Sequence, residues 1–203
     1  DSGVTVDLSS GTATDGFGDS DTLSNIENIK GTDEADQLTG SAADNIILGE
    51  AGDDVIAGLD GADTIDGGSG IDEIDYSADA AAGGDSGVTV DLSSGTATDG
   101  FGAEDTLSNI ENIKGTDEAD KLTGSDAANV IAGNAGDDVI AGLDGADTLV
   151  GGTGADQIDG GAGADQIVGG SGDDSILGGE GDDSILGDSG DDYIVGGIGS
   201  DAI

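Results

Sequence analysis

The residues with the clearest chemical potential in this chain are aspartates that recur every nine positions. Two stretches, residues 31–75 and 115–203, can be cut every nine residues without losing register, and the sixth residue of nearly every piece is Asp. Carboxylates held at one phase of a short repeat are suited to binding cations. The recurring aspartates are Asp36, Asp54, Asp63, Asp72, Asp120, Asp138, Asp147, Asp156, Asp165, Asp174, Asp183, Asp192 and Asp201.

The nine-residue pieces share the pattern G-G-x-G-x-D-x-U-x, in which U is a large aliphatic residue, as in GGSGDDSIL and GGEGDDSIL. A fixed period this short indicates a solenoid in which each repeat contacts only its neighbours. Glycines at the first, second and fourth positions permit a tight turn whose carbonyl groups point inward. The x-U-x that follows predicts a three-residue strand with its aliphatic side chain facing the core.

Two such pieces make one coil of turn, strand, turn and strand, so the turns of every second repeat stack on the same side. The space between stacked turns is then lined by backbone carbonyls and two Asp carboxylates. An all-oxygen, anionic and flexible cage suits Ca²⁺, whereas Mg²⁺ demands a stricter octahedron. Zn²⁺ prefers His or Cys ligands, and the chain has neither.

The repeats GGSGDDSIL and GGEGDDSIL resemble the repeats-in-toxin (RTX, hemolysin-type calcium-binding) nonapeptide. The resemblance implies an all-β chain folded as a right-handed parallel β-roll, a β-solenoid with stacked Gly/Asp calcium-binding turns. It implies several bound Ca²⁺ ions, with the thirteen recurring aspartates as their ligands. In this family the repeats leave the cell unfolded by type I secretion and fold on extracellular calcium, which implies a secreted protein at the cell surface.

The first repeats of each run depart from the pattern. Asn45 and Asn129 stand at the sixth position, and the turns GTDEAD, GSAADN and GSDAAN lack the internal glycine. An amide keeps an oxygen ligand but loses the negative charge. We therefore expect the best metal sites at the turns from Gly133 onward and at the turn pair of Gly49 and Gly67.

The sequence also contains a second, longer repeat that includes the nonapeptides. Residues 1–68 match residues 85–152 at 58 of 68 positions, with an offset of 84. In the module that precedes each run, GVTVDL predicts a half-buried strand and SSGTATDG a turn. The later LSNIENIKGT is compatible with a short helical turn, but we expect it to form two more rungs of the solenoid. We expect residues 76–84 to form a looser rung or a surface loop.

These patterns predict one continuous solenoid that is part of a longer polypeptide. Its expected parts are a strand/turn module at 1–30, a nonapeptide run at 31–75, an interrupting loop with a second strand/turn module at 76–114, and a nonapeptide run at 115–203.

The amino-acid composition excludes several classes of binding partner. The chain has 46 acidic residues against 3 basic ones, a formal net charge of -43, and no His or Cys. Nucleic acid is a poor partner because phosphates need Lys and Arg, and no apolar run is long enough to insert into a membrane. Without His there is no Ser–His or Cys–His couple, so we expect no catalytic residues, no enzyme and no organic cofactor. The expected partners are calcium, copies of the chain stacked end to end, and other surface-layer or matrix components.

Three functions are consistent with the sequence. The first is an extracellular structural rod in a cell-surface adhesin, surface-layer or matrix-fibre protein, because near-identical long units supply length. The second is the export and folding appendage of a secreted RTX enzyme or toxin, such as a protease, lipase, epimerase or cytolysin. The third is a calcium buffer, which predicts binding without a folding transition.

Overall fold

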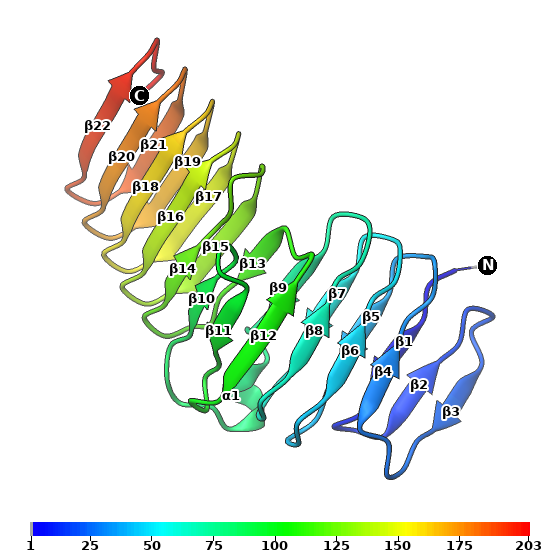
Figure 1. The fold of residues 1–203 in the computed structure, drawn as a ribbon. Helices are drawn as coiled ribbons and strands as arrows, with labels where there is room; N and C mark the ends of the chain where they lie inside the picture. The colour runs from blue at the N-terminus through cyan, green and yellow to red at the C-terminus, as the bar shows by residue number, and fades with distance from the viewer. Residues whose placement is uncertain (1) are drawn as a thin grey trace. The chain divides into compact units, whose positions relative to one another are not determined.

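The computed structural model describes residues 2–203 and divides them into two compact units of short strands (Figure 1). Unit 1 contains the described residues up to Asp85 together with Gly95–Ile110, and unit 2 contains Ser86–Ser94 and Glu111–Ile203. Each unit is a solenoid, and within its nonapeptide run successive strands alternate between two sheets. Helices with the length and apolarity needed to cross a membrane do not occur in residues 2–203.

Unit 1 has one sheet in the order β9-β7-β5-β1-β2-β3 and a second in the order β11-β12-β8-β6-β4. Its elements are β1 (Thr5–Asp7), β2 (Thr12–Thr14), β3 (Ser20–Thr22), β4 (Asn28–Lys30), β5 (Gln37–Thr39), β6 (Ile46–Leu48), β7 (Val55–Ala57), β8 (Thr64–Asp66), β9 (Glu73–Asp75), α1 (Asp79–Ala82), β11 (Thr96–Thr98) and β12 (Glu104–Ser108).

Unit 2 has one sheet in the order β21-β19-β17-β15-β13 and a second in the order β22-β20-β18-β16-β14-β10. Its strands are β10 (Thr89–Asp91), β13 (Asn112–Lys114), β14 (Lys121–Thr123), β15 (Val130–Ala135), β16 (Val139–Asp144), β17 (Thr148–Thr153), β18 (Gln157–Ala162), β19 (Gln166–Ser171), β20 (Ser175–Glu180), β21 (Ser184–Ser189) and β22 (Tyr193–Ile198).

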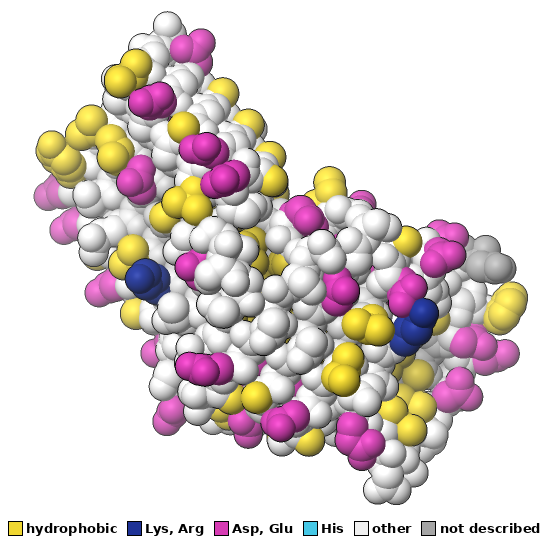
Figure 2. Space-filling model, in the orientation of Figure 1, with side chains coloured by type: hydrophobic (Ala, Val, Ile, Leu, Met, Phe, Trp, Pro, Cys, Tyr) yellow, Lys and Arg dark blue, Asp and Glu magenta, His cyan; other side chains and the backbone are white. Residues whose placement is uncertain are grey.

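The strands of the nonapeptide runs pair in parallel with an offset of 18 residues, which is two repeats. Ile131 pairs with Leu149 and Leu149 with Ile167, so identical repeat positions stack on one another. The aliphatic residue at the eighth position fills the interior, as predicted. This core column is Leu38, Ile47, Ile56, Ile65 and Ile74 in the first run and Leu122, Ile131, Ile140, Leu149, Ile158, Ile167, Ile176 and Ile185 in the second. Acidic side chains are spread over the visible surface (Figure 2).

Glycine is required where one turn lies against the next. Gly154, at the fourth position of its repeat, has φ of 131°, and a Cβ there would collide with the carbonyl oxygen of Gly136 in the turn 18 residues earlier. The second position also takes a positive φ even where it is not glycine, as at Asn134 (76°) and Leu143 (79°). The fourth position therefore needs glycine for space as well as for conformation.

The strand/turn modules are less regular than the sequence suggests. In the first copy β1 forms as predicted and pairs in parallel with β5, but the predicted turn SSGTATDG contains β2. Strands β1, β2 and β3 form an antiparallel meander. The following LSNIENIKGT supplies one of the two expected rungs in this copy, β4, which pairs in parallel with β6.

Residues 76–84 contain the short helix α1, where a loop or loose rung was expected. The segment DAAA favours a helix because alanine has the highest helix propensity. Gly83, with φ of 116°, ends the helix by donating its N–H to the carbonyl of Asp79. Just before α1, Tyr76 is fully buried.

We predict that Gly154→Ala destabilises the calcium-loaded chain by about 1–3 kcal/mol, because the new Cβ enters a left-handed, crowded turn. Chemical denaturation in saturating calcium measures the change in unfolding free energy. Thr153→Ala, at the exposed neighbouring position, is the matched control and should change stability by less than about 0.5 kcal/mol. Equal stability of the two variants would contradict the close approach of the turns.

Candidate metal centre

The recurring aspartates form ladders inside the turns. Eleven of the thirteen are at most 3% exposed, and only Asp192 and Asp201 are half-buried. Each ladder is built by a bond between coils: the backbone N–H of one sixth-position residue donates to Oδ1 of the Asp 18 residues later. Asp120 donates to Asp138 at 2.8 Å, and Asp138 donates to Asp156 at 2.9 Å. The same bond recurs from Asp36 to Asp54 at 2.8 Å in the first run.

This bond leaves the second carboxylate oxygen buried without a partner. Within residues 2–203, eight of these aspartates have an Oδ2 atom that is inaccessible to solvent and makes no hydrogen bond. They are Asp54, Asp63, Asp138, Asp147, Asp156, Asp165, Asp174 and Asp183. An unsatisfied buried polar atom costs about 1–3 kcal/mol, and more when it is charged. The ladders therefore fit a bound cation, which would satisfy these oxygens.

A backbone carbonyl lies beside seven of these eight oxygens, Asp63 Oδ2 being the exception. A Cβ placed on Gly133 would meet Asp138 Oδ2 and lie 2.7 Å from the carbonyl oxygen of Gly151. The same holds at Gly142, where the two oxygens belong to Asp147 and Gly160. The first glycine of the repeat thus keeps open a space that carboxylate and carbonyl oxygens share.

The donors of these turns are oxygen atoms from both side chains and the main chain. The described part of the chain has no group of three or more His, Cys, Asp or Glu side chains that could hold a metal. A cation in the turns would therefore depend on carbonyl oxygens as well as on stacked aspartates, which is the mixture of ligands that Ca²⁺ accepts.

The first aspartate of each run is the least available. Asp120 accepts hydrogen bonds at Oδ1 from the N–H of Val88 (2.7 Å) and the hydroxyl of Thr116 (2.9 Å), and at Oδ2 from the N–H of Thr116 (2.7 Å). Asp36 has the equivalent partners in Val4 and Thr32. Protein donors thus occupy both oxygens of the carboxylates where the internal glycines are missing.

The two asparagines make a different bond between coils, and their Oδ1 atoms accept the N–H groups of Ser41 and Ser125, each at 2.7 Å. The amide Nδ2 of Asn45 donates to the carbonyl of Glu27 at 2.6 Å, and that of Asn129 donates to the carbonyl of Glu111 at 2.5 Å. Each carbonyl belongs to the residue 18 positions earlier. Both polar atoms of each asparagine side chain therefore have protein partners.

The remaining predicted ligands also lie in the ladders. Asp72 Oδ1 accepts the N–H of Asp54 at 2.9 Å. Asp192 accepts the N–H of Asp174 at 3.0 Å, and Asp201 accepts that of Asp183 at 3.2 Å. The structure thus brings all thirteen predicted residues to equivalent places, although their role as calcium ligands stays a prediction.

Asp105 is a member of the ladder that the nine-residue pattern does not reveal. It lies in the second strand/turn module, 42 residues after Asp63, yet its Oδ1 accepts the N–H of Asp63 at 3.0 Å. Its Oδ2 accepts the hydroxyl of Tyr76 at 3.0 Å. The parallel pairing of β12 with β8 brings Asp105 here, and no local sequence signal marks it.

The acids at the fifth position have a second task that sequence reasoning missed. They are exposed, but several accept a backbone N–H from the turn 18 residues later. Asp137 Oδ1 accepts the N–H of Ala155 at 2.8 Å, and Asp173 accepts that of Asp191 at 2.9 Å. In these bonds the later turn donates to a carboxylate of the earlier turn, whereas in the sixth-position ladder the earlier residue donates to the later carboxylate.

Burial makes the ladder carboxylates weaker acids. Desolvation raises the pKa of Asp63 and Asp138 to about 7 and that of Asp147 to about 6, and neighbouring carboxylates add to the shift. Desolvation also raises the pKa of Asp54, Asp156, Asp165 and Asp174. Without a cation, the ionised form of these groups is the unfavourable one.

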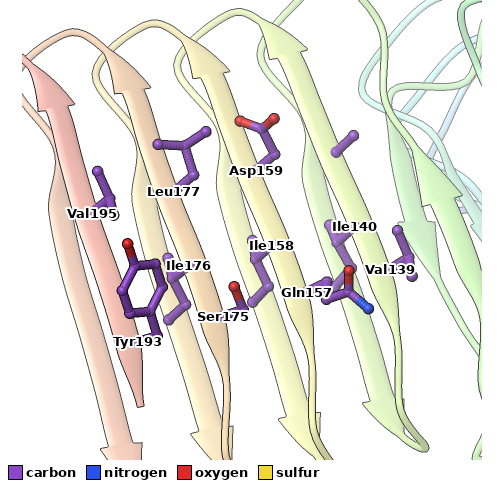
Figure 3. A pocket seen from close by; sticks show the side chains of 11 residues that line it. Val139, Ile140, Gln157, Ile158, Asp159, Ser175, Ile176, Leu177, Tyr193 and Val195 are labelled. Atoms are coloured by element: carbon purple, nitrogen blue, oxygen red, sulfur yellow. The ribbon is translucent and has the colours of Figure 1, made fainter.

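A separate groove lies on the outer face of the sheet that contains β16, β18, β20 and β22 (Figure 3). Outward-facing Gln157, Leu177, Tyr193 and Val195 are among its lining residues. Asp159 is its one carboxylate. The groove therefore does not bring two carboxylates together for acid–base chemistry.

Stacked Gly/Asp turns around an aliphatic core define a parallel β-roll of the calcium-binding kind. The comparison with known families finds the RTX calcium-binding nonapeptide repeat (four copies) at residues 21–53, 39–74, 106–140, 114–149, 141–176 and 168–203. These matches cover most of the chain, which therefore belongs to the RTX calcium-binding nonapeptide repeat family. No curated protein matches the chain.

We predict that replacing Asp156, Asp174 and Asp192 together by Ala raises the calcium concentration needed for folding. The three lie on one side of the roll, and each accepts a backbone N–H from the preceding coil. Circular dichroism during a calcium titration gives the folding midpoint. The control variant Asp126→Asn, Asp144→Asn, Glu180→Gln removes the same charge from exposed positions and should leave the midpoint near that of the parent chain. An unchanged midpoint in the ladder variant would refute the ligand assignment.

We also predict that acid favours the fold of the metal-free chain. The pKa of Asp63 and Asp138 is about 7 in the folded state against 3.8 for an ordinary Asp, so the folded chain binds more protons. Their contribution to stability is complete below pH 3.8 and is lost as the pH rises through 7. Protein stripped of metal on a chelating resin should gain β signal in circular dichroism from pH 8 to pH 5. Loss of β signal on acidification would contradict the raised pKa values.

Proposed function

We propose that this chain is a calcium-loaded β-roll that serves as an extracellular structural rod in a secreted cell-surface protein. An adhesin, a surface-layer protein or a matrix fibre is the setting that we favour. The observation that carries the calcium dependence is the set of eight buried Oδ2 atoms that make no hydrogen bond in the described chain. A fold that buries so many unsatisfied carboxylate oxygens is costly until a cation satisfies them.

Calcium would be held where the ladders and the glycine carbonyls meet. The best-equipped residues are those with a buried, unbonded Oδ2 next to a glycine carbonyl, such as Asp138, Asp147 and Asp156. The ion would supply positive charge between coils, and its binding free energy would become folding free energy. The chain's own part is to fix each carboxylate by the Oδ1 bond and to keep space open with glycine.

Charge supports folding outside the cell. With a formal charge of -43 the chain repels itself, and self-repulsion opposes a compact state. A chain of this kind stays expanded where free calcium is scarce and compacts where calcium is plentiful. This behaviour is compatible with export in an unfolded form, and it supports a rod that folds outside the cell.

Duplication supports the structural role. Residues 1–68 and 85–152 are near-identical, and duplication of this kind lengthens a solenoid without adding a new kind of site. The groove on β16, β18, β20 and β22 has one carboxylate, so we propose no enzymatic activity for this chain. The alternative, an export and folding appendage of a secreted RTX enzyme or toxin, rests on the same repeats and predicts the same calcium response.

We predict a cooperative transition from coil to β structure when CaCl₂ is added to the metal-free chain, because calcium satisfies the buried oxygens. Far-UV circular dichroism with CaCl₂ against EDTA measures it, and MgCl₂ is the control that should have little effect. A β spectrum that survives EDTA would contradict calcium-driven folding. Calcium binding without a spectral change would favour a buffer over a rod.

A further inference from the structure

Unit 1 contains one 16-residue sequence twice, in two different surroundings. Residues 11–26 and 95–110 differ at two positions, where Asp19 and Ser20 of the first copy are replaced by Ala103 and Glu104. In the second copy a nonapeptide rung and the segment with Tyr76 and α1 cover the sequence. In the first copy, β3 is the last strand of its sheet within the unit (Figure 1).

The two copies share one backbone conformation. The pairing of β2 with β3 aligns Ala13 with Asp21, and the pairing of β11 with β12 aligns Ala97 with Asp105. The unusual positive φ is also shared, at 55° for Asn25 and 50° for Asn109. The first copy is therefore already in the covered conformation, so a partner would not have to reorganise it.

The cover on the second copy begins with a strand. β8 pairs in parallel with β12, where the N–H of Thr106 donates to the carbonyl of Asp63 at 2.8 Å and the N–H of Gly67 donates to the carbonyl of Ser108 at 3.0 Å. Strand β12 spans five residues, whereas β3 in the first copy spans three. The two extra strand residues form where the partner strand is present.

The cover is completed by side chains. Asp105 accepts both the N–H of Asp63 and the hydroxyl of Tyr76, each at 3.0 Å. The N–H of Gly100 donates to the carboxylate of Asp79 in α1 at 2.9 Å. A strand edge, a tyrosine and a helix carboxylate thus contact the second copy together.

Equivalent residues of the two copies differ in burial, although their sequences are nearly identical. Asp105 is 2% exposed whereas its counterpart Asp21 is exposed. Ile110 is 7% exposed and its counterpart Ile26 is 48% exposed. Since the two stretches are nearly identical, the first copy presents the same contact groups without the neighbours that bury them in the second.

We propose that residues 11–26 form an acceptor site for a further copy of the segment Gly58–Gly84 carried in the same polypeptide. The donor would add its β8-like strand along Thr22–Ser24, direct its tyrosine at Asp21, and place its helix carboxylate against the N–H of Gly16. Each contact copies one seen in the second module. The same joint operates whether the chain is a rod or an export appendage, so the inference does not rest on the proposed function.

A donor in the same chain is favoured over a separate molecule. In the observed joint, ten residues separate Gly84 from Gly95, so donor and acceptor are tethered. A short tether gives an effective concentration of about millimolar, which a separate molecule rarely reaches. Two separate chains would also carry strong like charge, at -43 each.

Hydrogen exchange followed by mass spectrometry tests the acceptor, because the substitutions at residues 19 and 20 make the two peptides distinguishable. In saturating calcium, residues 95–110 of the parent chain should exchange at least ~10-fold more slowly than residues 11–26, since the cover adds several hydrogen bonds. Fusing a copy of residues 31–84 directly before Asp1 should slow residues 11–26 to the rate of residues 95–110. Equal protection in the parent chain, or no slowing in the extended chain, would overturn the proposal.

Matched variants distinguish protection caused by the covering segment from protection caused by the sequence differences at residues 19 and 20. Asp19→Ala with Ser20→Glu makes the first copy identical to the second and should leave it fast in the parent chain. Asp21→Ala should speed exchange of residues 11–26 by roughly 10-fold in the extended chain, since two hydrogen bonds are lost, and should have no effect in the parent chain. Protection that arises from the double substitution alone would overturn the proposal.

Two further measurements keep the test decisive. Asp105→Ala in the parent chain should bring residues 95–110 toward the fast rate, and this needs no extended chain; unchanged protection would show that these contacts do not hold the joint. Light scattering should find the extended chain monomeric. Protection that appears only in a dimer would overturn the tethered donor in favour of a second molecule.

Discussion

The fold depends on one bond between coils, in which a backbone N–H donates to Oδ1 of the aspartate 18 residues later. This bond fixes the carboxylate against the turn and leaves its other oxygen buried. In Asp147, Oδ1 accepts the N–H of Asn129 at 2.8 Å, while Oδ2 makes no hydrogen bond in the described chain. The glycine at the first position keeps space beside that oxygen. The ladder thus holds the stack together and sets the need for a cation.

The same bond explains why some repeats do not need a cation. Where threonine supplies an N–H and a hydroxyl, as at Asp36 and Asp120, both carboxylate oxygens are satisfied by protein. Where asparagine replaces aspartate, its amide reaches the carbonyl of the previous coil. Each nonapeptide run therefore begins with turns that are complete without metal and continues with turns that are not.

Much of the fold and of the aspartate ladder was predictable because both follow from a nine-residue period in the sequence. The nine-residue phase alone identified the buried column around Ile140 and Ile158 and the ladder aspartates. Contacts that join distant segments had no such signal. Asp105 and Tyr76 meet only because β12 pairs with β8, and the antiparallel meander of β1, β2 and β3 depends on pairing that a period of nine does not encode. The helix α1 was missed because four residues are too short to give a helical period.

The most direct test is a crystal structure of the calcium-loaded chain with an anomalous difference map for calcium. The ladder account predicts peaks at about 2.3–2.6 Å from the Oδ2 atoms of aspartates such as Asp147 and Asp165, and no peak between Asn129 and the carbonyl of Glu111. Peaks confined to the exposed acids at the fifth position, such as Asp137 and Asp173, would contradict it.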